Sequence, residues 1–210
     1  MPNLPSDDTL QKILTELELE NHLGALLTVQ MGGTPEEVQL LLQTTEFDEE
    51  RNGLRPTGSY IIRCLGVREH RVSVGLFNSM VYTETHALLW NHNYPFQQVY
   101  FSGMPDNVDG LMLELTQLYG QHYGNFRTLA DDLNRAMPLG KLLTSGRGLL
   151  GEMPIPMTEK VQKLLEGHGL AVSLIASDQN PPEAQHALLV MDDSFFIAQL
   201  YSADPLEGKN

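Results

Sequence analysis

Hydrophobic residues at helical spacing mark five stretches of the chain. The first follows the capping residues Ser6 and Asp7, and its apolar residues recur every three or four positions from Leu10. Thr34 caps a second stretch, which has Pro35 at the first helical position and acidic residues in its first turn. The helices predicted in this way span about residues 7–21, 35–44, 106–122, 126–136 and 158–167.

Runs of β-branched and aromatic residues, separated by short polar turns, predict strands. The connections in the middle of the chain are too short for parallel crossovers, so these strands are expected to form an antiparallel meander. The stretch 43–58 has no apolar period and contains Gly and Pro, which predicts a loop. The strand candidates are residues 23–30, 59–67, 71–77, 79–90 and 97–102, followed later by 170–177, 186–192 and 195–202.

The order of these elements predicts the α+β class, with a β-meander packed against helices. The tetrapeptide HALL occurs at residues 86–89 and again at residues 186–189, each time before an aromatic strand. A similar helical pattern precedes both copies. One interpretation is two related α-β-β-β units that form one compact body, and the other is chance similarity.

The same pattern suggests how the chain divides into domains. Residues 1–137 are expected to form an α+β unit with a four-stranded meander, and residues 138–156 a connector rich in Gly, Leu and Met. Residues 157–210 would form a smaller α-β-β-β unit. Because about 54 residues with one helix make only a marginal core, this unit is expected to pack on the first.

Charge and composition exclude several kinds of partner. The 210 residues include 27 acidic and 13 basic side chains, which gives a formal net charge of −14. A field of this sign repels phosphate backbones and argues against nucleic acid. No apolar stretch reaches membrane-spanning length, and the first residues do not resemble a signal peptide. With one cysteine, Cys64, these features predict a cytoplasmic protein.

Basic residues are concentrated in one segment of this acidic chain. Residues 51–71 carry a charge of +4 and directly follow an acidic run at residues 46–50. One interpretation is that the two stretches form surface ion pairs, which add little stability. The other is a site for an anion or an acidic partner, formed by Arg63, Arg68 and Arg71. Arg51 and Arg55 complete the arginine-rich segment.

The connector is unusually apolar for a glycine-rich segment. Apolar residues on such a loop must be covered by the protein itself or by a partner, and methionine suits a surface that adapts to different shapes. Self-packing, a short amphipathic helix, and a phosphate site at Lys141 and Arg147 are the alternatives. The residues predicted to bind a partner are Leu142, Leu143, Arg147, Leu149, Leu150 and Met153.

Few residues indicate catalysis. Cys64, Glu84, His86 and His92 would have to assemble in space to form an enzyme site, and buried cysteine is the simpler interpretation of Cys64. No nucleotide-binding, P-loop or nucleophile-elbow motif occurs, so neither cofactor nor metal is expected. Adjacent carboxylates such as those of Asp131 and Asp132 are expected to lie on a solvated face.

These observations favour a non-catalytic cytoplasmic protein-interaction module, such as an assembly factor, adaptor or regulator. We expect it to bind a protein partner or to self-associate. The alternatives are an enzyme built on Cys64, Glu84, His86 and His92, and a small-ligand module in which the meander and the connector cover an apolar compound.

Overall fold

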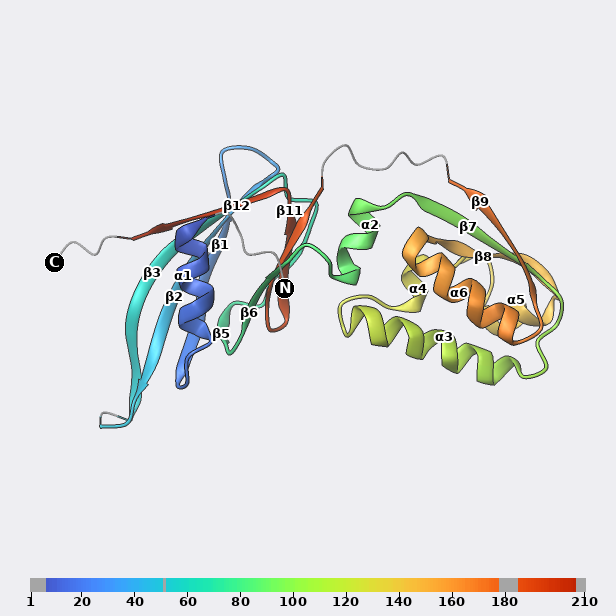
Figure 1. Ribbon diagram of the computed structural model, residues 1–210, viewed down its shortest axis with the longest axis horizontal. Helices are drawn as coiled ribbons and strands as arrows, with labels where there is room; N and C mark the ends of the chain where they lie inside the picture. The colour runs from blue at the N-terminus through green and yellow to red at the C-terminus, as the bar shows by residue number, and fades with distance from the viewer. Residues whose placement is uncertain (1–6, 51, 178–184, 207–210) are drawn as a thin grey trace. The chain divides into compact units, whose positions relative to one another are not determined.

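The computed structural model describes residues 7–50, 52–177 and 185–206, and confirms the α+β class. Helices account for 29% of the chain and strands for 43%, and the strands form three antiparallel sheets. The chain divides into two compact units (Figure 1). Unit 1 comprises Met1–His86 and Gln185–Asn210, and unit 2 comprises Ala87–Ala184. Ser6 and Arg51, which the sequence singled out, lie outside the described residues.

The described residues of unit 1 form one helix and two sheets. The five-stranded sheet has the order β12-β3-β2-β1-β5, and the four-stranded sheet has the order β4-β11-β10-β6. Its elements are α1 (Asp8–Leu17), β1 (His22–Met31), β2 (Glu37–Asp48), β3 (Gly53–Leu65), β4 (Glu69–Arg71), β5 (Gly75–Phe77), β6 (Met80–Thr83), β10 (Ala187–Met191), β11 (Ser194–Ala198) and β12 (Leu200–Pro205).

The core of unit 1 lies between its two sheets and α1. Alternate residues of β2 are buried, and they pack with residues of β3, β6, β10 and β11 in one cluster. The apolar face of α1 joins the same cluster. The Asp7 carboxylate accepts hydrogen bonds from the backbone of Leu10, which caps α1, and of Ala203 in β12. One side chain therefore fixes the start of the helix against a sheet edge.

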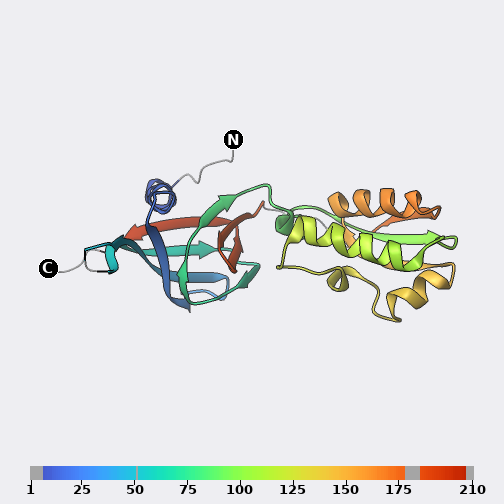
Figure 2. The ribbon, with the colours of Figure 1, turned by 90° about the horizontal axis from the view of Figure 1, so that it is seen from below.

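Unit 2 is a three-stranded sheet, ordered β8-β7-β9, with helices (Figure 2). Helix α6 contacts all three strands, and α3 packs against α6 and α5. The Thr158 hydroxyl lies 2.9 Å from the Gln97 side-chain oxygen, which joins α6 to β7. The elements are η1 (Ala87–Leu89), α2 (Trp90–Asn93), β7 (Phe96–Ser102), α3 (Val108–Tyr123), α4 (Leu129–Asp132), α5 (Leu139–Thr144), β8 (Arg147–Pro154), α6 (Ile155–Gly167) and β9 (Ala171–Ala176).

Unit 2 is inserted between two paired strands of unit 1. β6 precedes unit 2 in the chain and β10 follows it, yet they are antiparallel neighbours, with Thr83 opposite Leu188. This differs from the consecutive segments that the sequence suggested. Residues 157–210 are divided, because α6 and β9 belong to unit 2 whereas β10, β11 and β12 complete the sheets of unit 1.

The predicted helix at residues 35–44 and the loop at residues 43–58 are both wrong. These residues include all of β2 and the start of β3. Val38, Leu40 and Leu42 are buried on one face of β2, a spacing of two that belongs to a strand. The polar stretch that follows includes the end of a long hairpin, and its buried members Thr44 and Thr45 are polar, so the stretch carries no apolar period.

The two copies of HALL have different conformations. Residues 87–89 form the 3₁₀ helix η1, whereas residues 187–189 lie in strand β10. The similar segments before them also differ, since one is in β2 and the other is in α6. The two copies are therefore not equivalent strands of a duplicated unit.

The segments after residue 90 differ from the prediction in detail. Residues 97–102 pair with β8 and β9 rather than extending the meander of unit 1. Only α4 is helical within residues 126–136. The expected connector consists largely of α5 and β8 and leads directly into α6. No helix within the described residues is both long and apolar enough to cross a membrane.

Candidate functional site

The connector places most of its apolar side chains inside unit 2. Leu142 and Leu143 of α5 are buried, and so are Leu150 and Met153 of β8. Leu149 is half-buried, and only Arg147 of the residues predicted to bind a partner is exposed. The apolar character of this segment is therefore explained by the core that it forms, and the four buried residues do not offer a surface.

Methionines nevertheless lie at the surface beside this segment. Met104, in the turn after β7, is 67% exposed, and Met137, just before α5, is 43% exposed. Met112 of α3 is half-buried, and its sulfur would lie 3.4 Å from a Cβ added at Gly140. We call Met104, Met112 and Met137 together the methionine surface.

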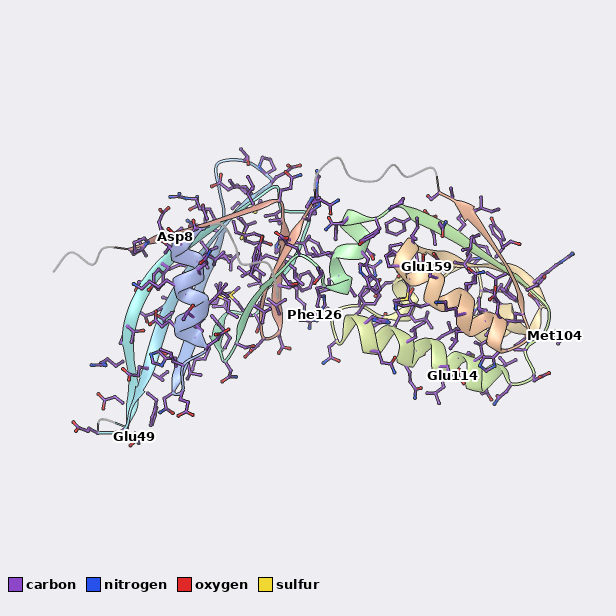
Figure 3. The ribbon with its side chains drawn as sticks, in the orientation of Figure 1. Asp8, Glu49, Met104, Glu114, Phe126 and Glu159 are labelled. Atoms are coloured by element: carbon purple, nitrogen blue, oxygen red, sulfur yellow. The ribbon has the colours of Figure 1, made fainter. Side chains whose placement is uncertain are left out.

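Two turns meet where Met104 lies, and one of them leads from α5 into β8. The backbone N–H of Gly103 donates to the carbonyl of Gly146 at 2.8 Å, so the turn after β7 lies against the turn before β8. A Cβ at Gly146 would lie 3.5 Å from Cγ of Met104, which places the Met104 side chain over that glycine. Figure 3 shows Met104 at the end of unit 2 where α5 also lies. Glycine at this position leaves the methionine room to lie on the backbone.

Positive charge borders the methionine surface on its α5 side. Arg135, Lys141 and Arg147 are exposed, and no acidic residue occurs between Asp132 and Glu152. The α3 side carries Asp106 and Asp109, both of which are also exposed. In a chain with a net charge of −14, this is an unusual local excess of cations beside an apolar surface.

A polar hollow of about 370 Å³ lies elsewhere on unit 2, beside β8. Its wall contains Asp132, whose side chain is only 2% exposed and pairs with Arg127, which is 21% exposed. The Tyr119 hydroxyl donates to the same carboxylate at 2.8 Å. Burial, with the Asp132 charge, raises the pKa of Tyr119 and keeps it a donor. The remaining lining residues are Phe96, Asp131, Leu133, Asn134, Leu149, Gly151 and Glu152.

The charged groups of this hollow are held by other groups of unit 2. With its amide oxygen turned towards Arg127, Asn91 accepts hydrogen bonds from the guanidinium at distances of 2.6–3.2 Å. Asp131 accepts from the backbone and hydroxyl of Thr128 and caps α4. Hydrogen bonding to Thr128 lowers the pKa of Asp131. The expectation of a solvated Asp131–Asp132 pair is therefore wrong for Asp132, which is part of a buried network.

Two of the three arginines predicted as an anion site pair with carboxylates of the same chain. Arg63 pairs with Asp204 at 2.8 Å, and Arg68 pairs with Glu36 at 3.4 Å. Arg71 is exposed in β4. A further pair, Arg55 with Glu46 at 2.6 Å, does join the arginine-rich segment to the acidic run. Exposed ion pairs thus account for three of the described arginines in this segment.

The residues of the enzyme alternative lie in different environments. Cys64 is fully buried in β3, and burial raises the pKa of its thiol to about 12, which disfavours a thiolate. Glu84 accepts from the Tyr82 hydroxyl at 3.2 Å, and burial together with Glu84 raises the pKa of Tyr82 to about 12. His86 belongs to unit 1, and His92 lies in α2 of unit 2. Among the described residues, no group of three His, Cys, Asp or Glu side chains could hold a metal ion.

Sequence reasoning missed Met104 and Met112, and it placed weight on buried leucines instead. Both methionines lie before the connector in the chain. The turn that carries Met104 meets the connector at Gly146, and the helix that carries Met112 meets it through the packing of α3 on α5. The sequence signals that could have indicated them are the glycines at positions 140 and 146, which leave space for a large neighbour. No protein-family model, no curated protein and no solved structure matches this chain.

The environment of the single tryptophan gives a pH-dependent prediction. The rings of Trp90 and His122 are 5.4 Å apart, and the Lys160 amine lies 5.9 Å from the Trp90 ring. Burial and the Lys160 charge lower the pKa of His122. A lowered pKa means that the unfolded chain binds the proton more readily, so the stability of unit 2 is expected to fall as the pH drops below about 6.5.

Chemical unfolding followed by Trp90 fluorescence at several pH values tests this expectation. The variant His122→Gln cannot gain this proton. Its stability is therefore expected to decrease less towards acid pH than that of the unmodified protein. Other titrating groups are common to both proteins and serve as the internal control. An unchanged pH dependence in the variant would show that His122 does not contribute.

Proposed function

We propose that this protein is a protein-interaction module whose partner binds at the methionine surface of unit 2. The observation that carries the proposal is the exposure of Met104 and Met137. Met104 lies over Gly146 after α5, Met137 comes just before α5, and Met112 is half-buried on α3, which packs on α5. Methionine is flexible and polarizable, so a surface that contains several methionines adapts to an apolar partner. An adaptor, assembly factor or regulator requires a surface of this kind.

Charge supports the same location. Lys141 and Arg147 border the methionines, so a partner with both apolar and acidic groups would be attracted and oriented there. The buried leucines of α5 and β8 have a different role, because they hold the backbone on which these cations are displayed. A cytoplasmic location remains part of this proposal and rests on the composition of the chain.

Site-specific photocrosslinking tests the proposal. The photoreactive amino acid benzoylphenylalanine is introduced in place of Met104 or Met137, and for the control in place of Glu159, which is exposed on α6. Irradiation in cells is expected to yield the same crosslinked protein, identified by mass spectrometry, from positions 104 and 137. The control position is expected to yield much less of this product.

Circular dichroism of each variant establishes that the fold is retained, since both methionines are exposed and tolerate substitution. Equal crosslinking from all three positions would indicate random collisions and would contradict the proposal. So would the absence of any product from positions 104 and 137.

A further inference from the structure

We propose that the partner at the methionine surface is a second copy of this chain, which binds through the end of its β2–β3 hairpin. This inference rests on the interaction function proposed above and adds the identity of the partner. It joins two surfaces of the same sequence that have opposite charge and that both expose apolar side chains. We call the second surface, formed by Glu46, Phe47, Asp48, Glu49, Glu50 and Leu54, the hairpin tip.

The hairpin tip combines apolar and acidic side chains. Phe47 and Leu54 are cross-strand partners at the end of the hairpin, and they are 40% and 39% exposed. Four acidic residues surround them, and a hollow of about 290 Å³ is lined by residues 46–50 and Arg55. Figure 3 labels Glu49 at the outer end of the hairpin. An exposed aromatic ring beside an acid-lined hollow suits a long cationic side chain, whose stem is apolar and whose head is charged.

The methionine surface supplies the complementary groups. Lys141 and Arg147 are exposed long cations, and Met104 and Met137 are exposed apolar side chains beside them. Arg55 pairs with Glu46 within the hairpin, and the four acidic and two basic residues at positions 46–55 leave the tip with a net charge of −2. We therefore place Lys141 or Arg147 of one copy in the hollow of the other, with Phe47 and Leu54 against the methionines.

The geometry has a consequence for the assembly. The two surfaces are different parts of one chain, so each copy presents one of each and the contact is heterologous. Such a contact forms a closed ring if the rotation between successive copies completes a full turn, and otherwise it forms an open chain of copies. Apolar contact supplies most of the affinity, and the charges set the orientation and the association rate.

Sedimentation velocity of the full chain at low salt, over about 1–100 μM, tests the inference. We expect the average mass to rise with concentration. The variant Lys141→Glu/Arg147→Glu is expected to weaken association by about tenfold, because the attraction between the cationic border and the acidic tip becomes repulsion. The variant Glu49→Lys/Glu50→Lys, at two exposed positions of the tip, is expected to do the same. Combining all four substitutions restores opposite charges and is expected to restore association.

A matched control reverses two cations elsewhere. Lys12 and Lys163 are exposed on α1 and α6, and Lys12→Glu/Lys163→Glu changes the net charge by the same amount as the first variant. This control is expected to associate no more than threefold more weakly than the unmodified chain, since only long-range repulsion increases. Circular dichroism confirms that each variant is folded.

Three results would overturn the inference: a monomer at every concentration, oligomers that respond equally to the control and to the surface variants, or no recovery in the fourfold variant. These results are distinct from failure of the proposed function. A chain that stays monomeric but crosslinks one other protein from positions 104 and 137 refutes self-association and supports the interaction surface.

Discussion

Replacing Asp132 with alanine is expected to lower the free energy of unfolding of unit 2 by about 3 kcal/mol. The carboxylate is nearly fully buried and is bonded to both Arg127 and Tyr119. Its removal takes the carboxylate away from a guanidinium and a hydroxyl in a poorly solvated place, and the loss costs more than the pair itself contributes, although Asn91 still accepts hydrogen bonds from Arg127. Because Arg127 keeps some exposure to water, we place the effect at the lower end of the stability losses that follow removal of one partner from a buried ion pair.

Urea unfolding followed by Trp90 fluorescence measures this change, since Trp90 lies in unit 2 and is the only tryptophan. Asp109→Ala provides the control, because Asp109 is an exposed acid in the first turn of α3 and its loss should cost less than about 1 kcal/mol. The double variant Arg127→Met/Asp132→Leu should lose less stability than the two single changes together. Additive losses would show that the two side chains are not coupled.

Replacing Gly151 with alanine is expected to cost about 3 kcal/mol. A Cβ at this position would lie 2.2 Å from the backbone oxygen of Asp132 and 3.0 Å from Cα of Leu133. Leu133 forms a β-bridge with Gly151, so the segment after α4 lies directly on β8. The obstructing atoms are backbone, which cannot rotate away as a side chain can, and the segment must move as a whole.

Gly120→Ala is the matched control for this substitution. Gly120 lies within α3, and a Cβ there would meet nothing within 4 Å. Alanine favours the helix over glycine, so this change should stabilise unit 2 by about 0.5–1 kcal/mol. Thermal unfolding of both variants should move the midpoint in opposite directions. A stable Gly151→Ala variant would mean that the segment after α4 does not rest on β8.

The sequence predicted elements well where local signals agreed. The helix at the start of unit 1 was found because Asp7 caps it and its apolar residues are spaced for one face. β2 was missed because Thr34 and Pro35 are strong helix-start signals. The pairing of β2 with both β1 and β3 outweighs them, and that pairing is set by residues distant in the chain.

The two copies of HALL show a general limit of local patterns. Ala, Leu and Leu are buried in η1 and are also buried in β10. Burial was thus predictable, but the conformation was not. A 3₁₀ helix and a strand can both bury these side chains, and the neighbouring elements decide which of the two conformations forms. Similarly, the residues that border Asp132 and the methionines come together through the packing of α3, α4 and α5, which spacing along the chain does not reveal.

The insertion of unit 2 between β6 and β10 has a consequence for folding order. β6 can find its partner only after all of unit 2 has been synthesised, because β10 follows it in the chain. Closing a loop costs conformational entropy, and a loop that has already folded has less of it to lose than an unstructured chain. Unit 2 can fold during translation, before the last strands of unit 1 exist. A substitution that delays folding of unit 2 would therefore also delay assembly of a sheet in which no residue has been changed.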